Sequence, residues 1–271
     1  MRKLYPLGRL ALTGLLVGPA VSHAADPSGV PTSDLLDWLL SPLSGAAEHH
    51  LPDWAAWHAR LMVLAWVVLI PLGVMAARFF KVTPHQRWPQ ELDNKTWWHA
   101  HRGLQYAGVA AMTVGLALAW GRAGGGGPGA RVHAVLGGCL CLLGWLQVLG
   151  GVLRGSKGGP TAVQLRGDHF DMTVRRVVFE WLHKTLGYAA LLVALLTVAL
   201  GLVVADAPHW MVLTLGAWAL LAVGAFVVLQ RRGRCIDTYQ AIWGPDSRLP
   251  GNRRAPIGWG VRRGAPANST Q

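Results

Sequence analysis

The sequence predicts an all-α integral membrane protein with five transmembrane helices. Hydrophobic residues make up 52% of the 271 residues and charged residues only 14%, against about 25% charged in soluble proteins. The apolar residues form runs long enough to cross a hydrocarbon core of about 30 Å as helices. The formal net charge is +12, and the basic residues that produce it lie mostly between and after these runs. This pattern indicates membrane topology and argues against nucleic-acid binding.

Residues 1–24 are expected to form a secretory signal peptide. The chain starts with a basic segment (1–3), continues with a short apolar stretch (10–21) and reaches a small-residue cleavage site (22–24). An uncleaved sixth helix is the alternative, and Pro19 together with the short run argues against it.

Residues 25–53 are expected to form a short extracytoplasmic segment. Residues 35–40 fit a small amphipathic helix on the membrane surface. His49 and His50 follow, and they are interpreted as solvated loop histidines, with metal binding or a position near an electron partner as the alternatives.

The transmembrane domain covers residues 54–230. Its five helices are expected at residues 55–80, 99–121, 131–153, 179–205 and 209–230. Basic residues lie mostly in the loops after the first and third helices and after the fifth helix, whereas the other two loops have few. Because basic loops stay in the cytoplasm, this pattern predicts an outside N-terminus and a cytoplasmic C-terminus.

The tail, residues 231–271, contains eight arginines and two aspartates and is rich in glycine and proline. We expect a basic, flexible, cytoplasmic tail that touches anionic lipid headgroups. Cys235, Tyr239 and Trp243 leave open the alternative that the first part of the tail is docked.

Four histidines stand near the starts of four different predicted helices: His58, His101, His133 and His183. The first and third helices run inward, so His58 and His133 share the outer level. The second and fourth run outward, so His101 and His183 share the cytoplasmic level. Helices of the same direction lie diagonally in a four-helix bundle of alternating direction. The sequence therefore predicts two facing histidine pairs.

A haem suits such pairs, because its iron accepts one imidazole from each side of a flat apolar ring. The chain has no C-x-x-C-H motif, which excludes covalent c-type attachment and leaves two b haems. Zinc suits these pairs less well, because it commonly takes four ligands and each pair provides only two. The prediction is a four-helix dihaem bundle, with His58 and His133 on the outer haem iron and His101 and His183 on the cytoplasmic-side haem iron.

Other residues near these levels have two interpretations each. Glycines either make room for a porphyrin or allow close helix packing: Gly108, Gly115, Gly137, Gly138, Gly144 and Gly187. Arginines either pair with haem propionates or anchor the helices: Arg60 and Arg131 outside, Arg78, Arg102 and Arg154 inside.

Four further histidines compete for these roles. His99 is two residues from His101, so the two cannot face one cofactor. His209 follows Pro208 and is expected at the membrane interface. His85 and His169 lie in loops, where they are solvated or contact an electron donor.

The chain resembles the cytochrome b561 family, especially the five-helix core found linked to DOMON domains. The motifs that carry the resemblance are His58 to Lys81 with Trp66, Pro71-Leu72-Gly73 and Ala77-Arg78; the H-x-x-x-Q of His101 to Gln105; Arg131-Val132-His133 with Leu146-Gln147-Val148; and the H-x-x-x-G-Y of His183 to Tyr188. The resemblance covers residues 54–230. About thirty residues precede this core, so no DOMON domain is expected there.

The resemblance implies two b haems on the same histidine pairs and electron transfer across the membrane. In the family the donor is often cytoplasmic ascorbate, and the acceptor is ferric iron or monodehydroascorbate. The ascorbate motifs of the six-helix members are not found in this sequence.

The hypothesis is a transmembrane dihaem b-type cytochrome, an oxidoreductase of the ferric-reductase or ascorbate-dependent type, in a bacterial plasma membrane. Its partners would be membrane lipid and a small-molecule or protein electron donor and acceptor, with a homodimer left open and no catalytic side chain expected. A quinol-linked cytochrome b subunit and a non-redox membrane scaffold or transporter are the alternatives. Helix interiors nearly lack carboxylates, which argues against a proton relay.

Overall fold

The computed structural model describes residues 32–47, 50–122 and 127–264. The expected signal peptide and His49 lie outside these ranges. Within them the regular elements are helices, accompanied by two isolated β-bridges. Their bounds are α1 Thr32–Leu40, α2 Asp53–Val63, the π-helical η2 Leu64–Leu69, α3 Ile70–Phe79, α4 Thr96–Ala119, α5 Pro128–Val152, α6 Asp168–Asp171, α7 Val174–Val204, α8 His209–Arg231, α9 Thr238–Trp243 and the 3₁₀ turn η4 Pro250–Arg253.

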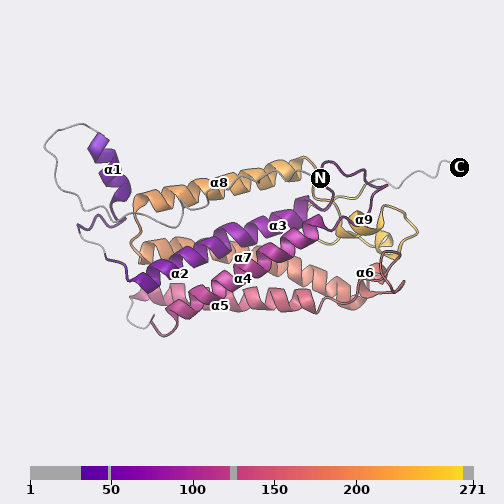
Figure 1. The fold of residues 1–271 in the computed structure, drawn as a ribbon, viewed down its shortest axis with the longest axis horizontal. Helices are drawn as coiled ribbons and strands as arrows, with labels where there is room; N and C mark the ends of the chain where they lie inside the picture. The colour runs from indigo at the N-terminus through magenta and orange to yellow at the C-terminus, as the bar shows by residue number, and fades with distance from the viewer. Residues whose placement is uncertain (1–31, 48–49, 123–126, 265–271) are drawn as a thin grey trace, which may run out of the picture.

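The long helices lie side by side along one axis (Figure 1). The continuous helix α2-η2-α3 contacts α4, α4 contacts α5, α5 contacts α7, and α7 returns to α2 and η2. This cyclic order places α2 opposite α5 and α4 opposite α7. Helix α8 (orange in Figure 1) lies outside this ring, where it contacts α3 and α1.

The prediction of an all-α membrane fold is confirmed. Four helices of the described part are long and apolar enough to cross a membrane: Asp53–Phe79, Pro128–Val152, Val174–Val204 and His209–Arg231. Helix α4 has a similar length, 24 residues, but is less apolar because its first turns carry histidine, arginine and glutamine. It still packs inside the ring.

Helix α7 begins five residues before the predicted start. Its first turns are polar, so the apolar run shows only where the membrane part begins. Oγ1 of Thr173 caps the helix by accepting a hydrogen bond from the backbone N–H of Arg176. Arg176 and Glu180, one turn apart, then form a salt bridge of 2.9 Å, which supports helix beyond the apolar segment.

The first long helix is irregular at η2, just before Pro71. Proline has no backbone N–H, so the carbonyl four residues earlier, that of Val67, loses its helical donor. Nε1 of Trp218 in α8 donates to this carbonyl oxygen at 2.9 Å. The hydrogen bond attaches the outer helix α8 to the ring at membrane depth. An unsatisfied carbonyl there would cost on the order of several kcal/mol, as for other buried polar groups.

The chain after α8 folds over one end of the bundle. We call residues 232–264 the C-terminal cap. Tyr239 and Trp243 of α9 are buried against Phe170 and Met172, and the hydroxyl of Tyr239 donates to the carbonyl of Phe170 at 2.8 Å. The sequence analysis treats residues 231–271 as flexible and leaves a docked first part open. In the structure residues 232–264 are docked, because aromatic side chains from α6 and α9 bury one another.

Basic side chains of the bundle hold this cap by binding its backbone carbonyls. Nζ of Lys81 donates to Ile236 at 3.0 Å, and Nζ of Lys184 donates to Ile257 at 2.9 Å. Lys81, a basic loop residue expected to mark only membrane topology, therefore has a structural partner as well.

Candidate functional site

The first ring pair consists of His58 from α2 and His133 from α5. Their ring centroids are 6.1 Å apart, with an angle of 81° between the planes. Nδ1 of His58 donates to the carbonyl of Gly115 at 2.9 Å, and Nδ1 of His133 donates to the carbonyl of Thr197 at 3.1 Å. Since a carbonyl only accepts, each Nδ1 carries a proton, and the neutral form of each ring then has its lone pair on Nε2.

The second ring pair consists of His101 from α4 and His183 from α7. Their centroids are 6.3 Å apart and their planes are 85° apart. Nδ1 of His101 donates to the carbonyl of Gly73 at 3.0 Å. The ring of His183 stacks on Phe179 with a centroid distance of 5.1 Å. The structure therefore brings together the same two pairs that the sequence predicts.

The two ring pairs lie at opposite ends of the membrane-spanning bundle. Three helices each carry a histidine of one pair and a carbonyl that binds a histidine of the other pair. These positions are 58 and 73, 101 and 115, and 183 and 197. A separation of 14 or 15 residues corresponds to about 21 Å along a helix.

The ring geometry fits an iron between the two members of each pair. A metal–imidazole bond of about 2 Å on each side of one iron puts the ring centres about 6 Å apart, close to the two observed values. Among the described residues, no three His, Cys, Asp or Glu side chains group as a metal site. The pairs therefore suit a metal whose remaining ligands come from a cofactor, as in haem.

The glycines near the rings divide into two groups. A Cβ at Gly187, one helical turn after His183, would meet nothing within 4 Å, so this position leaves space beside that ring. Gly138 is equally open, but it is exposed and makes no room at His133. A Cβ at Gly108 would lie 2.8 Å from Cγ1 of Ile70, and one at Gly144 would lie 3.1 Å from Sδ of Met112. These two positions serve helix packing.

A packed apolar layer separates the two ring pairs. It contains residues from all four ring helices: Ala65, Trp66, Ile70, Met112, Leu140, Cys141, Ala190 and Ala194. Met112 is fully buried and Trp66 is 4% exposed. This layer excludes water from the centre of the bundle.

The competing histidines lie elsewhere. His99 and His50 are exposed. His209 stacks on Trp38 of α1 at 4.4 Å, and its Nδ1 donates to the carbonyl of Ser41 at 2.9 Å. His209 therefore joins α1 to α8 and faces neither ring pair.

The interpretation of His169 as a solvated loop histidine is wrong. Its side chain is buried between Tyr239 and Trp243, with Nε2 3.7 Å from Oε1 of Glu180. Burial, followed by the charge of nearby Arg176, lowers the pKa of His169 to about 3.

Sequence reasoning missed the buried carboxylate of Glu180. It lies three residues before His183 and forms salt bridges with Arg176 at 2.9 Å and Lys184 at 2.7 Å. The spacing of four residues between these charges is a helical ion-pair pattern, and it is the signal that identifies the cluster.

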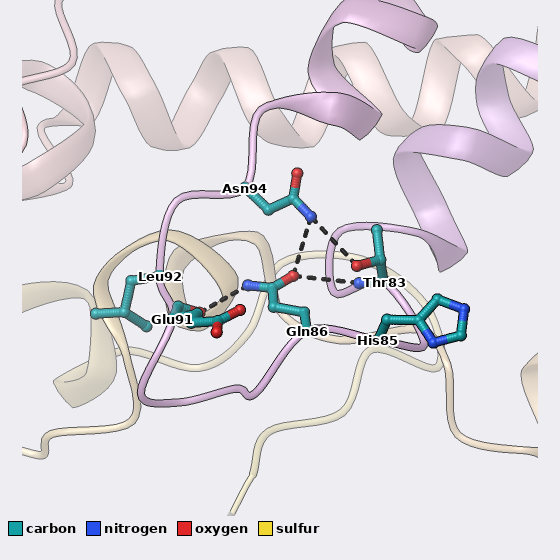
Figure 2. Close-up of a pocket in the computed structure, with 6 residues that line it drawn as sticks. All are labelled: Thr83, His85, Gln86, Glu91, Leu92 and Asn94. Carbon is teal, nitrogen blue, oxygen red and sulfur yellow. Dashed lines mark hydrogen bonds between the residues drawn. The ribbon is translucent and has the colours of Figure 1, made fainter. Parts of the chain in front are cut away.

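His85 lies in the loop between α3 and α4, at the rim of a surface pocket of about 320 Å³. Figure 2 shows its exposed ring beside a hydrogen-bonded network, not within it. Oε1 of Gln86 accepts from Asn94 at 3.1 Å and from the backbone of Thr83 at 3.2 Å. These hydrogen bonds stabilise the loop conformation. His85 takes no part in them and belongs to neither ring pair.

The sequence profile described as eukaryotic cytochrome b561 matches residues 57–209, more than half of the chain, and this match contains all four ring histidines. The chain belongs to the cytochrome b561 family. The family prediction is thereby confirmed, and membership together with the apolar helices identifies an integral membrane protein. The family implies a haem b cofactor.

Several curated proteins are similar to this cytochrome b561 region. Human ferric-chelate reductase 1 is 28% identical over 181 residues, which cover 64% of this chain and 27% of the human protein. A cytochrome b561 and DOMON domain-containing protein of Arabidopsis thaliana is 31% identical over 146 residues, covering 54% of this chain and 27% of that protein. The chain thus spans about a quarter of the length of these relatives. No solved structure matches it.

Proposed function

We propose that this protein is a dihaem b-type cytochrome that transfers electrons across the membrane, from a cytoplasmic-side donor to an extracytoplasmic acceptor. One observation carries the proposal: two facing imidazole pairs, with centroid distances of 6.1 and 6.3 Å, stand at the two ends of one transmembrane bundle. Membership of the cytochrome b561 family supports it.

In this proposal His58 and His133 hold one haem, and His101 and His183 hold the other. A bound haem supplies a one-electron redox couple. The chain supplies free Nε2 lone pairs in a fixed orientation, because backbone carbonyls bind Nδ1 of three of the four rings. Such outer partners orient metal-bound histidines and increase their basicity.

The orientation in the membrane follows from the basic residues. The loop between α3 and α4, the α5–α7 connection with α6, and the C-terminal cap all lie at the right-hand end in Figure 1. These segments carry most of the basic residues outside the helices, so the positive-inside rule assigns this end to the cytoplasm. His101 and His183 are then on the cytoplasmic side. Residues 1–24 remain the proposed signal peptide, and the bacterial plasma membrane stays a prediction.

The acceptor proposed here is a ferric chelate. Three of the similar proteins are named ferric-chelate reductase 1, from human, cattle and mouse. The sequence lacks the ascorbate motifs of six-helix members, so the donor is proposed only as a small or protein reductant at the cytoplasmic end.

Haem content of the purified protein tests the proposal first. We expect two haem b per chain and an α-band in the reduced-minus-oxidised spectrum; a protein that carries none or only one contradicts it. Vesicles that contain the protein and enclose ascorbate should then reduce an external ferric chelate, whereas protein-free vesicles should not. If a quinol analogue reduces the haems and ascorbate does not, the electron donor is a quinol and not a soluble reductant.

A further inference from the structure

Basic side chains surround the second ring pair. Arg102 follows His101 on α4, Arg154 follows the end of α5, and Arg176 and Lys184 stand on α7 beside His183. Glu180 is the acidic partner of the two α7 cations, with salt bridges of 2.9 and 2.7 Å. Arg176 and Lys184 therefore share the carboxylate of Glu180 as their acidic partner. Arg102 and Arg154 form no salt bridge among the described residues.

Arg154 and Arg102 both lie against Trp98. The guanidinium carbon of Arg154 is 3.9 Å from the centroid of the Trp98 ring, and that of Arg102 is 5.5 Å from the same ring. Arg102 also lies 5.4 Å from the ring centre of Tyr106. Trp98 in turn is 6.3 Å from the ring of His101. The two guanidinium groups therefore border the second ring pair.

The hydrogen-bond donors of these two arginines are free. Within the described residues neither side chain forms a hydrogen bond, and a cation–π contact occupies none of the five N–H groups of a guanidinium. Arg154 is half-buried, and burial followed by the charges of Arg176 and Arg102 lowers its pKa to about 10. Arg154 is thus a partly desolvated cation with unused N–H donors, and a bound anion would stabilise it.

Arg78 differs, although the sequence groups it with Arg102 and Arg154. Its Nη1 donates to the hydroxyl of Tyr188 at 2.6 Å. Its Nη2 donates to Oε1 of Gln230 and to the carbonyl of Trp259, both at 2.8 Å. These contacts attach the C-terminal cap to α7 and α8 and leave little of Arg78 for a ligand.

We infer that Arg102 and Arg154, supported by Trp98, form a carboxylate-binding site beside the second ring pair. Two free guanidinium groups match two carboxylates, which is the number of propionates on a haem b. A soluble organic acid that approaches the same end carries the same chemistry. Only the propionate source rests on the proposed function.

The propionate source is tested with haem b and haem dimethyl ester, whose propionates are uncharged. Both are titrated into haem-depleted protein that carries His133→Ala, so that only the His101–His183 site can bind. We expect haem b to bind about 10- to 100-fold more tightly than the ester, as for ligands held by charge-assisted hydrogen bonds. Combining Arg102→Gln with Arg154→Gln should remove this preference and leave ester binding unchanged.

Ester binding also shows that the variant is folded. Arg248→Gln is the matched control, because Arg248 is an exposed arginine paired with Asp246 at 2.9 Å, and it should keep the preference for haem b.

The soluble source is tested with citrate, added to the protein with both haems bound, by calorimetric titration. If the arginine variant keeps the preference for haem b but loses citrate binding, the site takes soluble carboxylates. If the variant changes neither measurement, the inference is overturned while the dihaem function stands. If the wild type binds no haem, the proposed function fails, and citrate binding that depends on the two arginines would still support the site.

Discussion

Nδ1 of His58 in α2 donates to the carbonyl of Gly115 in α4, while Nδ1 of His101 in α4 donates to the carbonyl of Gly73 in α3. The exchange is reciprocal: each of the two long helices contributes a histidine to one ring pair and a glycine carbonyl to the other. It requires close approach, because a Cβ at Gly115 would lie 3.3 Å from Cβ of Leu61. Helix packing and ring orientation are therefore coupled at both ends.

The first prediction concerns Gly73→Ala. The added Cβ would meet Nε2 of Gln105, which is bonded to the carbonyl of Ile70 at 3.0 Å, and would lie 3.2 Å from Cβ of Leu104. Relieving these contacts moves α3 from α4 and costs about 1–3 kcal/mol. We expect the His101–His183 site to lose haem affinity or to change its midpoint potential while the other site keeps both, as measured by redox titration. Gly224→Ala in α8, where a Cβ meets nothing within 4 Å, is the control. Equal effects on both sites would contradict the coupling.

The second prediction is that His183→Ala halves the haem content. Removing one imidazole leaves His101 alone on one side of the cofactor, whereas His58 and His133 are about 21 Å away along the bundle. We expect a ratio near one haem per chain by absorption of the extracted haem, with His85→Ala at the wild-type ratio. Two haems retained in His183→Ala would refute the assignment.

The third prediction is that Arg78→Gln loosens the C-terminal cap. The substitution removes hydrogen bonds to Tyr188, Gln230 and the carbonyl of Trp259, and each bond from a charged donor contributes about 1.5–3 kcal/mol. Protease cleavage within residues 254–264 should become faster, and mass spectrometry of the fragments measures its rate. Arg87→Gln, which removes only an exposed salt bridge to Glu91, should leave the rate unchanged. A cleavage rate equal to that of the wild type in Arg78→Gln would show that other contacts hold the cap.

The fourth prediction is that the cap loses stability as the pH falls below about 6.5, through His169. Burial and the charge of Arg176 lower the pKa of this ring to about 3 in the folded protein, whereas in an unfolded chain it is about 6.5. Between these values the unfolded state binds one more proton, so stability falls by up to about 1.4 kcal/mol per pH unit. Above pH 6.5 both states are neutral and the contribution is constant.

The charged and titratable groups that face His169 are Arg154, Arg176, Glu180, Lys184 and Tyr239. Since these groups remain in His169→Gln, the difference between the two proteins isolates the histidine. Thermal unfolding of the cap at pH 5 and pH 7.5 should show a smaller loss for His169→Gln than for the wild type, and His85→Gln should behave as the wild type. An identical loss in His169→Gln would exclude this ring as the cause.

The sequence by itself determined the helices and the composition of both ring pairs. Apolar runs are local, and a helix start fixes the depth of a histidine, so topology alone paired His58 with His133 and His101 with His183. The family followed from the same motifs, because these residues occur at fixed spacing within single helices.

Only the tertiary structure decided which groups complete the site. The carbonyls of Gly73, Gly115 and Thr197, and the contact of Trp218 with Val67, join residues 28 to 151 positions apart, and no local pattern encodes such partners. The same holds for the burial of His169 under α9. Arg78 and Arg102 likewise look alike as basic residues near a helix end. Only the packed structure shows that both terminal nitrogens of Arg78 are hydrogen-bonded, whereas the side chain of Arg102 forms no hydrogen bond among the described residues.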